Sequence, residues 1–254
     1  MESQTVTSSI QLSVVIPAHN ESENLKWLVP TTIGALRQGG ISYELVVVDD
    51  HSTDNTLHLL RELSERLPGI RIIQQNGEKG FGRTLYEGFQ KARGEVVVPF
   101  MGDASDDPVD ILKLYHKIEE GYDVVYGSRF TEGGSIRDYP FLKLVANRLG
   151  NGLVRWLFRI QEKDITNAFK AFRRETLLRF FPIEANAFNI TLELAIKAHL
   201  AGCRYTSVPV HWEGRTSGVS HFRLRDLTRY YRDYLSTLLT MWGQARKKGE
   251  AIKR

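Results

Sequence analysis

Short apolar runs alternate with amphipathic segments along the first hundred residues of the chain. The runs are rich in β-branched residues and occur at 12–17, 43–50, 70–74 and near 96–100. Segments with helical spacing follow the first three and end near Gln38, Arg66 and Arg93. Uninterrupted apolar runs indicate strands that are buried on both faces. The alternation therefore predicts an α/β fold, with a doubly wound, mainly parallel sheet flanked by helices.

Two amphipathic helices are predicted in the second half, over 141–160 and within 222–245. Both place apolar side chains at helical spacing with arginines between them. Such a stripe can be buried in the core, which is one interpretation. The combination of arginine and tryptophan also suits a lipid headgroup layer, so the second interpretation is docking at a membrane surface.

The distribution of charge along the chain indicates which kinds of binding partner to expect. The net charge is +4, but residues 222–254 hold nine basic and three acidic side chains, which leaves the rest of the chain slightly acidic. The sequence has neither zinc-ligand spacing nor an aromatic-basic nucleic-acid motif, so no nucleic-acid partner is expected. A basic amphipathic end facing anionic lipid is favoured.

Targeting signals and cysteine usage indicate the compartment. The single Cys203 forms no internal disulfide, no signal-peptide pattern precedes the first strand, and no apolar run approaches the roughly 20 residues that span a bilayer. We expect a cytoplasmic protein, peripheral at the cytosolic face of a membrane. The expected organisation is a disordered N-terminus (1–10), a catalytic domain (11–220), and a basic amphipathic helix and tail (221–254).

Carboxylates gather after the fourth apolar run. Asp103, Asp106 and Asp107 lie within five positions, directly before Pro108. Mg²⁺ or Mn²⁺ binds one or two such carboxylates and completes its shell with water and phosphate oxygens. The alternative is that Asp-Asp-Pro only starts a helix.

Polar residues also follow the other predicted strands. Ligands of doubly wound sheets sit at the carboxyl ends of the strands, which brings the following residues to one rim: Asn20, Glu21, Asp49, Asp50, Lys79 and Asp103. This favours a shared site for a nucleoside diphosphate and a metal ion. Lys79 and Gly80 suit contact with a polyphosphate, although the glycines of Lys-Gly-Phe-Gly could simply end a loop and the P-loop spacing is absent.

An ordered set of motifs resembles the inverting glycosyltransferases of family 2, which have the GT-A fold. The motifs are Val-Val-Ile-Pro-x-x-Asn-Glu (14–21), Val-Val-Asp-Asp-x-Ser-x-Asp-x-Thr (47–56), Lys-Gly-x-Gly (79–82) and the Asp103 stretch. Later segments resemble the dolichol-phosphate mannose synthase group: Gly-Ser-Arg-Phe (127–130), Asp-Ile-Thr-Asn-Ala-Phe-Lys (164–170), Val-Pro-Val (208–210) and Arg-Thr-Ser-Gly-Val-Ser (215–220). That group has interfacial helices at the two amphipathic segments.

The resemblance implies a role for each matching residue. Pro17, Asn20 and Glu21 would line the nucleotide pocket, with Asp50 at the base and Asp49, Lys79 and Gly80 beside it. Asp103 and Ser105 would hold Mg²⁺ or Mn²⁺. Arg129 would face the acceptor phosphate, and Arg215 and His221 would lie near the donor diphosphate.

Three positions depart from the family pattern. Met101 stands where the first Asp of Asp-Ala-Asp is expected, which implies weaker metal binding. Asn167-Ala168 replaces the commoner Ser-Gly, and His221 replaces a lysine, which makes that charge dependent on pH.

The function implied is inverting transfer of a hexose from GDP-mannose or a UDP-sugar to a polyprenyl or dolichyl phosphate. An ionised phosphate acceptor needs no general base. A saccharide hydroxyl acceptor would need one, for which Asp164 or Glu193 is a candidate. A second alternative, supported only by Met101, is a non-catalytic partner protein with the same fold. A separate membrane-anchoring partner or a homo-oligomer is left open.

Overall fold

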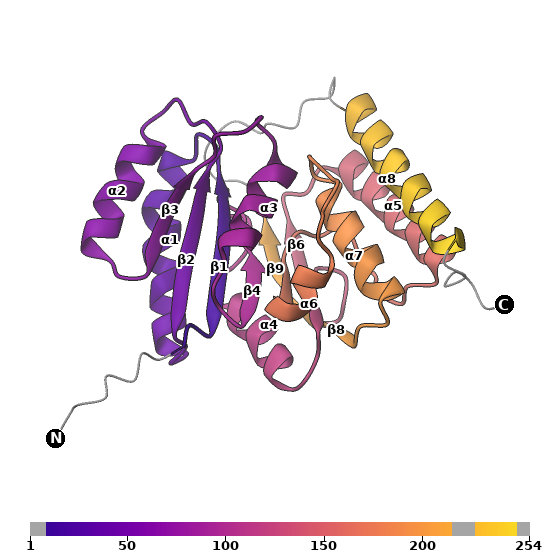
Figure 1. Ribbon diagram of the computed structural model, residues 1–254, viewed down its shortest axis with the longest axis horizontal. Coiled ribbons are helices and arrows are strands. Elements are labelled where there is room, and N and C mark those ends of the chain that lie inside the picture. Colours follow the sequence, from indigo (N-terminus) through magenta and orange to yellow (C-terminus); the bar gives the residue numbers. More distant parts are fainter. Residues whose placement is uncertain (1–8, 215–226, 248–254) are drawn as a thin grey trace.

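The computed structural model describes residues 9–214 and 227–247. Its centre is a seven-stranded sheet in the order β3-β2-β1-β4-β7-β5-β8, beside a two-stranded sheet of β6 and β9 (Figure 1). The strands are β1 (Leu12–Ala18), β2 (Tyr43–Asp49), β3 (Ile70–Gln74), β4 (Val96–Pro99), β5 (Val124–Ser128), β6 (Ser135–Arg137), β7 (Lys170–Arg173), β8 (Tyr205–Pro209) and β9 (His211–Glu213). The predicted mainly parallel sheet is confirmed.

Helices cover both faces of the large sheet. They are α1 (Ser22–Gln38), α2 (Thr56–Arg66), α3 (Phe81–Lys91), α4 (Asp110–Glu119), α5 (Phe141–Phe158), α6 (Arg174–Arg179), α7 (Ile190–Leu200) and α8 (Leu227–Lys247). One apolar core joins the sheet to α1, α2 and α4, and a second joins its other face to α3 and to α5 through α8. The apolar runs of β1, β2 and β4 alternate between these two cores, which is why they contain few polar residues.

The hydrophobic pattern predicted β1 to β4 and none of the strands β5 to β9, of which β7 is the least expected. β7 lies in the middle of the sheet and runs antiparallel to both β4 and β5. Its first residue is Lys170, whose side chain is only 1% exposed. A lysine usually marks the surface, so a buried one at the start of a four-residue strand conceals that strand from a hydrophobicity pattern.

A buried carboxylate joins three segments at the opposite end of the sheet from the strand-end carboxylates. Glu44 accepts hydrogen bonds from the Ser13 hydroxyl (2.6 Å), the Arg93 backbone N–H (2.6 Å) and the Arg71 guanidinium (2.6 Å). Burial acts to raise the pKa of Glu44, but these hydrogen bonds and the charge of Arg71 outweigh burial and lower the pKa. The ionised carboxylate therefore stabilises the folded state.

We expect Glu44→Gln to lower the free energy of unfolding at pH 7 by about 1.5–3 kcal/mol, because charge-assisted hydrogen bonds are lost. The pKa of Glu44 is lower in the folded state, so its contribution is present above the unfolded-state pKa and disappears as the pH falls through the folded-state value. Urea unfolding at pH 7 and pH 3 measures this. The difference between variant and wild type should shrink at pH 3, and the exposed-site control Glu62→Gln should change neither value.

The two predicted amphipathic helices lie side by side (Figure 1), and the Tyr234 hydroxyl of α8 donates a hydrogen bond to the Gly150 carbonyl of α5 (3.0 Å). α5 ends at Phe158, two residues earlier than expected, with Arg159 in a left-handed conformation. Each helix buries one face in the core and leaves apolar side chains on the other: Phe141, Leu142, Val145, Leu149, Leu153 and Trp156 on α5, and Tyr231, Leu235 and Leu239 on α8. Burial in the core therefore accounts for one face of each helix only. Among the described helices none is long and apolar enough to cross a bilayer.

Candidate functional site

The turns after three adjacent strands share an uncommon backbone conformation. Asn20 follows β1, His51 follows β2 and Ala104 follows β4, and their φ angles are 55°, 57° and 59°. Non-glycine residues adopt the left-handed region at a cost, and such residues cluster at functional sites. Because β2, β1 and β4 are neighbours in the sheet, the three strained turns lie along one edge.

The turn after β1 is tied to the turn after β2. The Asn20 side-chain oxygen accepts hydrogen bonds from the backbone N–H groups of Thr53 (2.7 Å) and Asp54 (3.3 Å). Glu21 is buried and accepts a hydrogen bond from Asn24 (2.6 Å). The structure thus brings together the Asn-Glu and Asp-Asp motifs, directly after Pro17 and Ala18 of β1 and Asp49 of β2.

Lys79 and Asp50 meet through His19. The His19 Nδ1 lies 2.7 Å from the Asp50 carbonyl oxygen, and its Nε2 lies 2.6 Å from the Lys79 ammonium. The His19 ring therefore bridges the Asp50 backbone and the Lys79 side chain. The Asp50 carboxylate also accepts a hydrogen bond from the Gly80 N–H (3.2 Å). This fixes Lys79 at the rim where a diphosphate was predicted.

The glycines of Lys-Gly-Phe-Gly have a packing role. A Cβ on Gly82 would lie 2.5 Å from the Ala185 carbonyl oxygen, and one on Gly80 would lie 2.7 Å from the Asn186 carbonyl oxygen. Only glycine permits this approach. A cavity of about 540 Å³ adjoins the segment, between Lys79, residues 184–189 and α8.

The three carboxylates after β4 have different surroundings. Asp103 accepts hydrogen bonds from the Ser105 N–H (3.2 Å) and hydroxyl (2.7 Å), and Asp107 accepts one from the Val109 N–H (2.9 Å). Asp107 thus stabilises the turn that precedes α4, whose N-cap is Val109. Asp106 is 3% exposed, and its Oδ1 has no hydrogen-bond partner in the described part of the chain. Burial, followed by the charge of Asp103, raises the pKa of Asp106 to about 8.

This turn fits a hard divalent cation that takes few protein ligands. Its donor atoms are all oxygens, and the buried Asp106 carboxylate keeps one oxygen unbonded beside Asp103. Within residues 9–214 and 227–247 no group of three or more His, Cys, Asp or Glu side chains gathers as a metal site. Mg²⁺ and Mn²⁺ are the ions that accept one or two carboxylates and draw the rest of their shell from water and phosphates.

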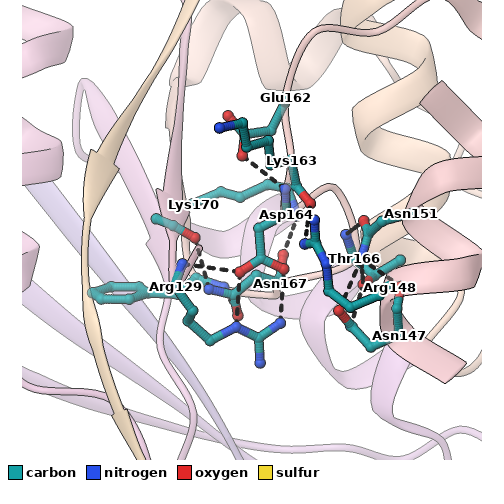
Figure 2. Close-up of polar contacts among 12 residues, drawn as sticks. Arg129, Asn147, Arg148, Asn151, Glu162, Lys163, Asp164, Thr166, Asn167 and Lys170 are labelled. Carbon is teal, nitrogen blue, oxygen red and sulfur yellow. Dashed lines mark hydrogen bonds and ion pairs between the residues drawn. The ribbon is translucent and has the colours of Figure 1, made fainter. Parts of the chain in front are cut away.

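Arg129 forms a buried, bidentate ion pair with Asp164 (Figure 2). Its Nε and Nη2 donate to the two carboxylate oxygens at 2.8 Å each, and its backbone N–H donates at 3.0 Å. Burial acts to lower the pKa of Arg129, but the hydrogen bonds and charge of Asp164 outweigh it and raise that pKa. Arg129 follows β5, so a permanent positive charge is fixed near the Asp103 turn.

Both candidate bases for a hydroxyl acceptor are occupied. Asp164 is fully buried and uses both oxygens on Arg129. Glu193 is also buried, accepts backbone hydrogen bonds from Glu184 and Ala185, and pairs with Lys197 at 2.6 Å. In this structure both carboxylates are therefore engaged by protein groups, which disfavours either of them as a general base.

The segment around Asp164 is held between β5 and α5. Asn151 of α5 accepts a hydrogen bond from the Thr166 N–H (3.1 Å), and the Asn167 side chain donates to the Gly127 carbonyl (2.8 Å), as Figure 2 shows in part. Asn167, which departs from the family pattern, therefore anchors its segment to β5. Lys170 donates to the Asn167 carbonyl, and burial lowers the pKa of Lys170 to about 7. The motifs at 127–130 and 164–170 contain these residues, but no pattern in the sequence indicated that they contact one another.

Two predicted site residues, Arg215 and His221, lie outside the described residues. The other predicted site residues fall into two groups. Those on the turns after β1, β2, β3 and β4 are brought together, and Arg129 lies on the neighbouring turn after β5.

Comparison with known proteins identifies the family of this chain. A model of "Glycosyl transferase family 2" matches residues 13–181. The chain belongs to glycosyltransferase family 2. The family 2 chain is 33% identical over 227 residues to a dolichol-phosphate mannosyltransferase of Pyrococcus furiosus, covering 88% of the chain and 62% of that protein. It is 30% identical over 222 residues to a polyprenol monophosphomannose synthase of Mycolicibacterium smegmatis, covering 85% and 82%.

The fold of the family 2 chain also matches a solved structure. A glucosyl-3-phosphoglycerate synthase of Mycobacterium tuberculosis, crystallised with Mn²⁺, UDP-glucose and phosphoglyceric acid, superposes with a TM-score of 0.70 over 92% of this chain and 80% of that one. At 20% sequence identity this likeness concerns the fold alone. The GT-A prediction is confirmed, as is the predicted family.

Proposed function

We propose that this chain transfers a hexose from a nucleotide sugar to a polyprenyl phosphate. The observation that carries the proposal is the buried Arg129–Asp164 pair. It fixes a permanent cation beside the carboxylate turn, which suits an anionic acceptor, and it consumes a carboxylate that a hydroxyl acceptor would need. The relatives named as acting on dolichol or polyprenol phosphates support the same acceptor class.

The reaction is a single displacement with inversion. An oxygen of the acceptor phosphate attacks the anomeric carbon, the bond to the diphosphate oxygen breaks, and the nucleoside diphosphate leaves with that electron pair. Arg129 binds and orients the acceptor phosphate, which is ionised at neutral pH and needs no base. Asp50, Lys79 and Glu21 line the donor pocket, with GDP-mannose or a UDP-hexose as the donor.

Asp103 and Ser105 would hold a divalent cation, Mg²⁺ or Mn²⁺, with the Asp106 carboxyl group beside them. When bound, the cation neutralises charge on the departing diphosphate. Met101 leaves this turn with one carboxylate fewer than the family pattern, so the turn alone would hold a cation more weakly.

A transfer assay tests the function. Purified protein is incubated with Mg²⁺ or Mn²⁺, a short polyprenyl phosphate and a panel of radiolabelled GDP- and UDP-sugars, and label is counted after extraction into organic solvent. Lipid-phase label supports the proposal and identifies the donor. Transfer to a soluble saccharide alone would establish the hydroxyl-acceptor alternative, and nucleotide binding without any transfer would establish the non-catalytic one.

The acceptor lipid places the protein at a membrane, and the outer faces of α5 and α8 suit that surface. α5 has three basic residues and no acidic ones, and its exposed apolar stripe includes Leu149 (70% exposed) and Trp156 (77% exposed). Apolar side chains flanked by arginines enter the headgroup region of anionic membranes. α5 also carries Asn151, which anchors the Asp164 segment, so docking brings lipid to the side of the site where Arg129 lies. The proposed location is the cytosolic face.

We expect the double variant Leu149→Glu/Trp156→Glu to bind vesicles containing phosphatidylglycerol at least about tenfold more weakly, because two inserted apolar groups are replaced by anions. Vesicle co-sedimentation measures the bound fraction. Trp27→Glu, on α1 across the sheet, is the control and should bind like wild type. Unchanged binding of the double variant would contradict membrane docking, and a change from oligomer to monomer would identify the stripe as a self-association surface.

A further inference from the structure

Strand β9 lies against the carboxylate turn through backbone contacts. Trp212 forms an antiparallel bridge with Asp106, and the Glu213 N–H donates to the Ser105 carbonyl oxygen (2.9 Å). On its other side β9 pairs with β6, where Ile136 lies opposite Trp212. The short strand therefore adjoins the proposed metal-binding turn through Trp212 and Glu213.

The side chain of Trp212 extends from the carboxylate turn toward Arg129. Its indole ring packs edge-on against the Tyr139 ring, with centroids 4.9 Å apart and an interplanar angle of 63°. Tyr139 in turn lies 5.7 Å from the Arg129 guanidinium carbon, and the Phe130 ring lies 5.5 Å from the same atom. A continuous path of contacts thus runs from Asp106 through Trp212 and Tyr139 to Arg129.

β9 is fixed in place rather than loosely attached. The His211 N–H donates to the buried Asp110 carboxylate at the start of α4 (2.8 Å), and Lys113 pairs with the same carboxylate (2.5 Å). A Cβ on Gly134, directly before β6, would lie only 2.6 Å from the Ser128 carbonyl oxygen, so β6 packs closely on the chain leading to Arg129. Such close packing holds the distance between the carboxylate turn and Arg129 constant.

We propose that Trp212 is a positioning residue, whose indole ring holds Tyr139 against Arg129 at a set distance from the Asp103 turn. The inference rests on the proposed function, in which Arg129 binds the acceptor phosphate and Asp103 serves the donor. Trp212 touches neither substrate. Its contribution is to hold Arg129 in the orientation that binds the acceptor phosphate, so its loss weakens acceptor binding.

Trp212→Leu tests the inference because it removes the aromatic contact and leaves the backbone bridge to Asp106. We expect KM for polyprenyl phosphate to rise about tenfold and KM for the donor to stay within about twofold, since only acceptor binding is disturbed. Trp212→Phe, which keeps an aromatic edge, should restore most of the acceptor affinity. Trp27→Leu is the control on α1. Equal acceptor KM in wild type and Trp212→Leu would overturn the inference.

A second measurement does not depend on turnover. The Nε–H signal of Arg129 is recorded in a ¹H–¹⁵N spectrum of ¹⁵N-arginine-labelled protein and assigned with Arg129→Lys. We expect Trp212→Leu to shift or broaden it, and Tyr139→Leu to do the same with no additional effect in the double variant, because the two rings act in series. An unchanged signal overturns the inference. Absence of wild-type transfer, with the signal altered as expected, would instead reject the proposed function alone.

Discussion

Asp164→Ala is expected to lower the free energy of unfolding by about 3–5 kcal/mol, because it leaves the Arg129 guanidinium buried without its counter-charge. The carboxylate is fully buried and makes three hydrogen bonds to Arg129, one of them to the backbone. Transfer activity should be lost with it, since the arginine no longer has a fixed orientation. Urea unfolding and the lipid-phase assay measure the two effects.

The matched control removes both charges. Arg129→Met/Asp164→Leu replaces the pair with apolar side chains of similar size and should unfold at a higher urea concentration than Asp164→Ala, because no charge is left buried alone. It should remain inactive, since the acceptor phosphate has lost its cation. If the double variant were as unstable as Asp164→Ala, the cost would arise from packing and not from the unpaired guanidinium.

Asp103→Asn is expected to lower kcat at least about 100-fold while leaving the urea midpoint unchanged, because the amide still accepts the Ser105 hydrogen bonds but removes the charge that holds the cation. The Mn²⁺ concentration needed for half-maximal activity should rise, and chelation of the metal in wild-type protein should mimic the variant. Mn²⁺ binding followed by electron paramagnetic resonance, with the nucleotide present, reports the metal separately from turnover.

Asp107→Asn is the matched control in the same turn. Asp107 accepts a hydrogen bond from the Val109 N–H in the turn before α4, and asparagine preserves that hydrogen bond. Its kcat and Mn²⁺ dependence should match wild type. Equal losses in the two variants would mean that the charge of the whole turn matters, and full activity of Asp103→Asn would remove Asp103 from the metal site.

The strands and the rim of the site could be predicted from local pattern. The apolar runs that become β1, β2, β3 and β4 match the structure closely, because strands buried on both faces must be continuously apolar. Asp50, Lys79 and Asp103 were then placed on one edge by the rule that parallel strands end together. The predicted helix ends at Gln38 and Arg66 match α1 and α2, whereas α3 ends at Lys91, two residues before the predicted Arg93.

Contacts between distant segments could not be predicted in the same way. Arg129 and Asp164 are 35 residues apart, and Asp164 alone is equally consistent with a general base. Trp212 and Asp106 meet only because β9 and the carboxylate turn pack together. Periodicity reports which face of a single element is apolar and carries no information on which polar groups of two elements will pair.

The sequence by itself determined the alternating strands and helices, the edge at which their polar turns gather and the family to which the chain belongs. Each of these follows from local apolar runs and ordered motifs, which can be recognised without knowing which segments meet in the fold. Only the tertiary structure decided that β7 enters the sheet antiparallel, that Asp164 is the partner of Arg129 and that Trp212 lies between the carboxylate turn and Tyr139. These depend on the pairing of buried charged and aromatic groups, which is chosen by the packing of the whole chain.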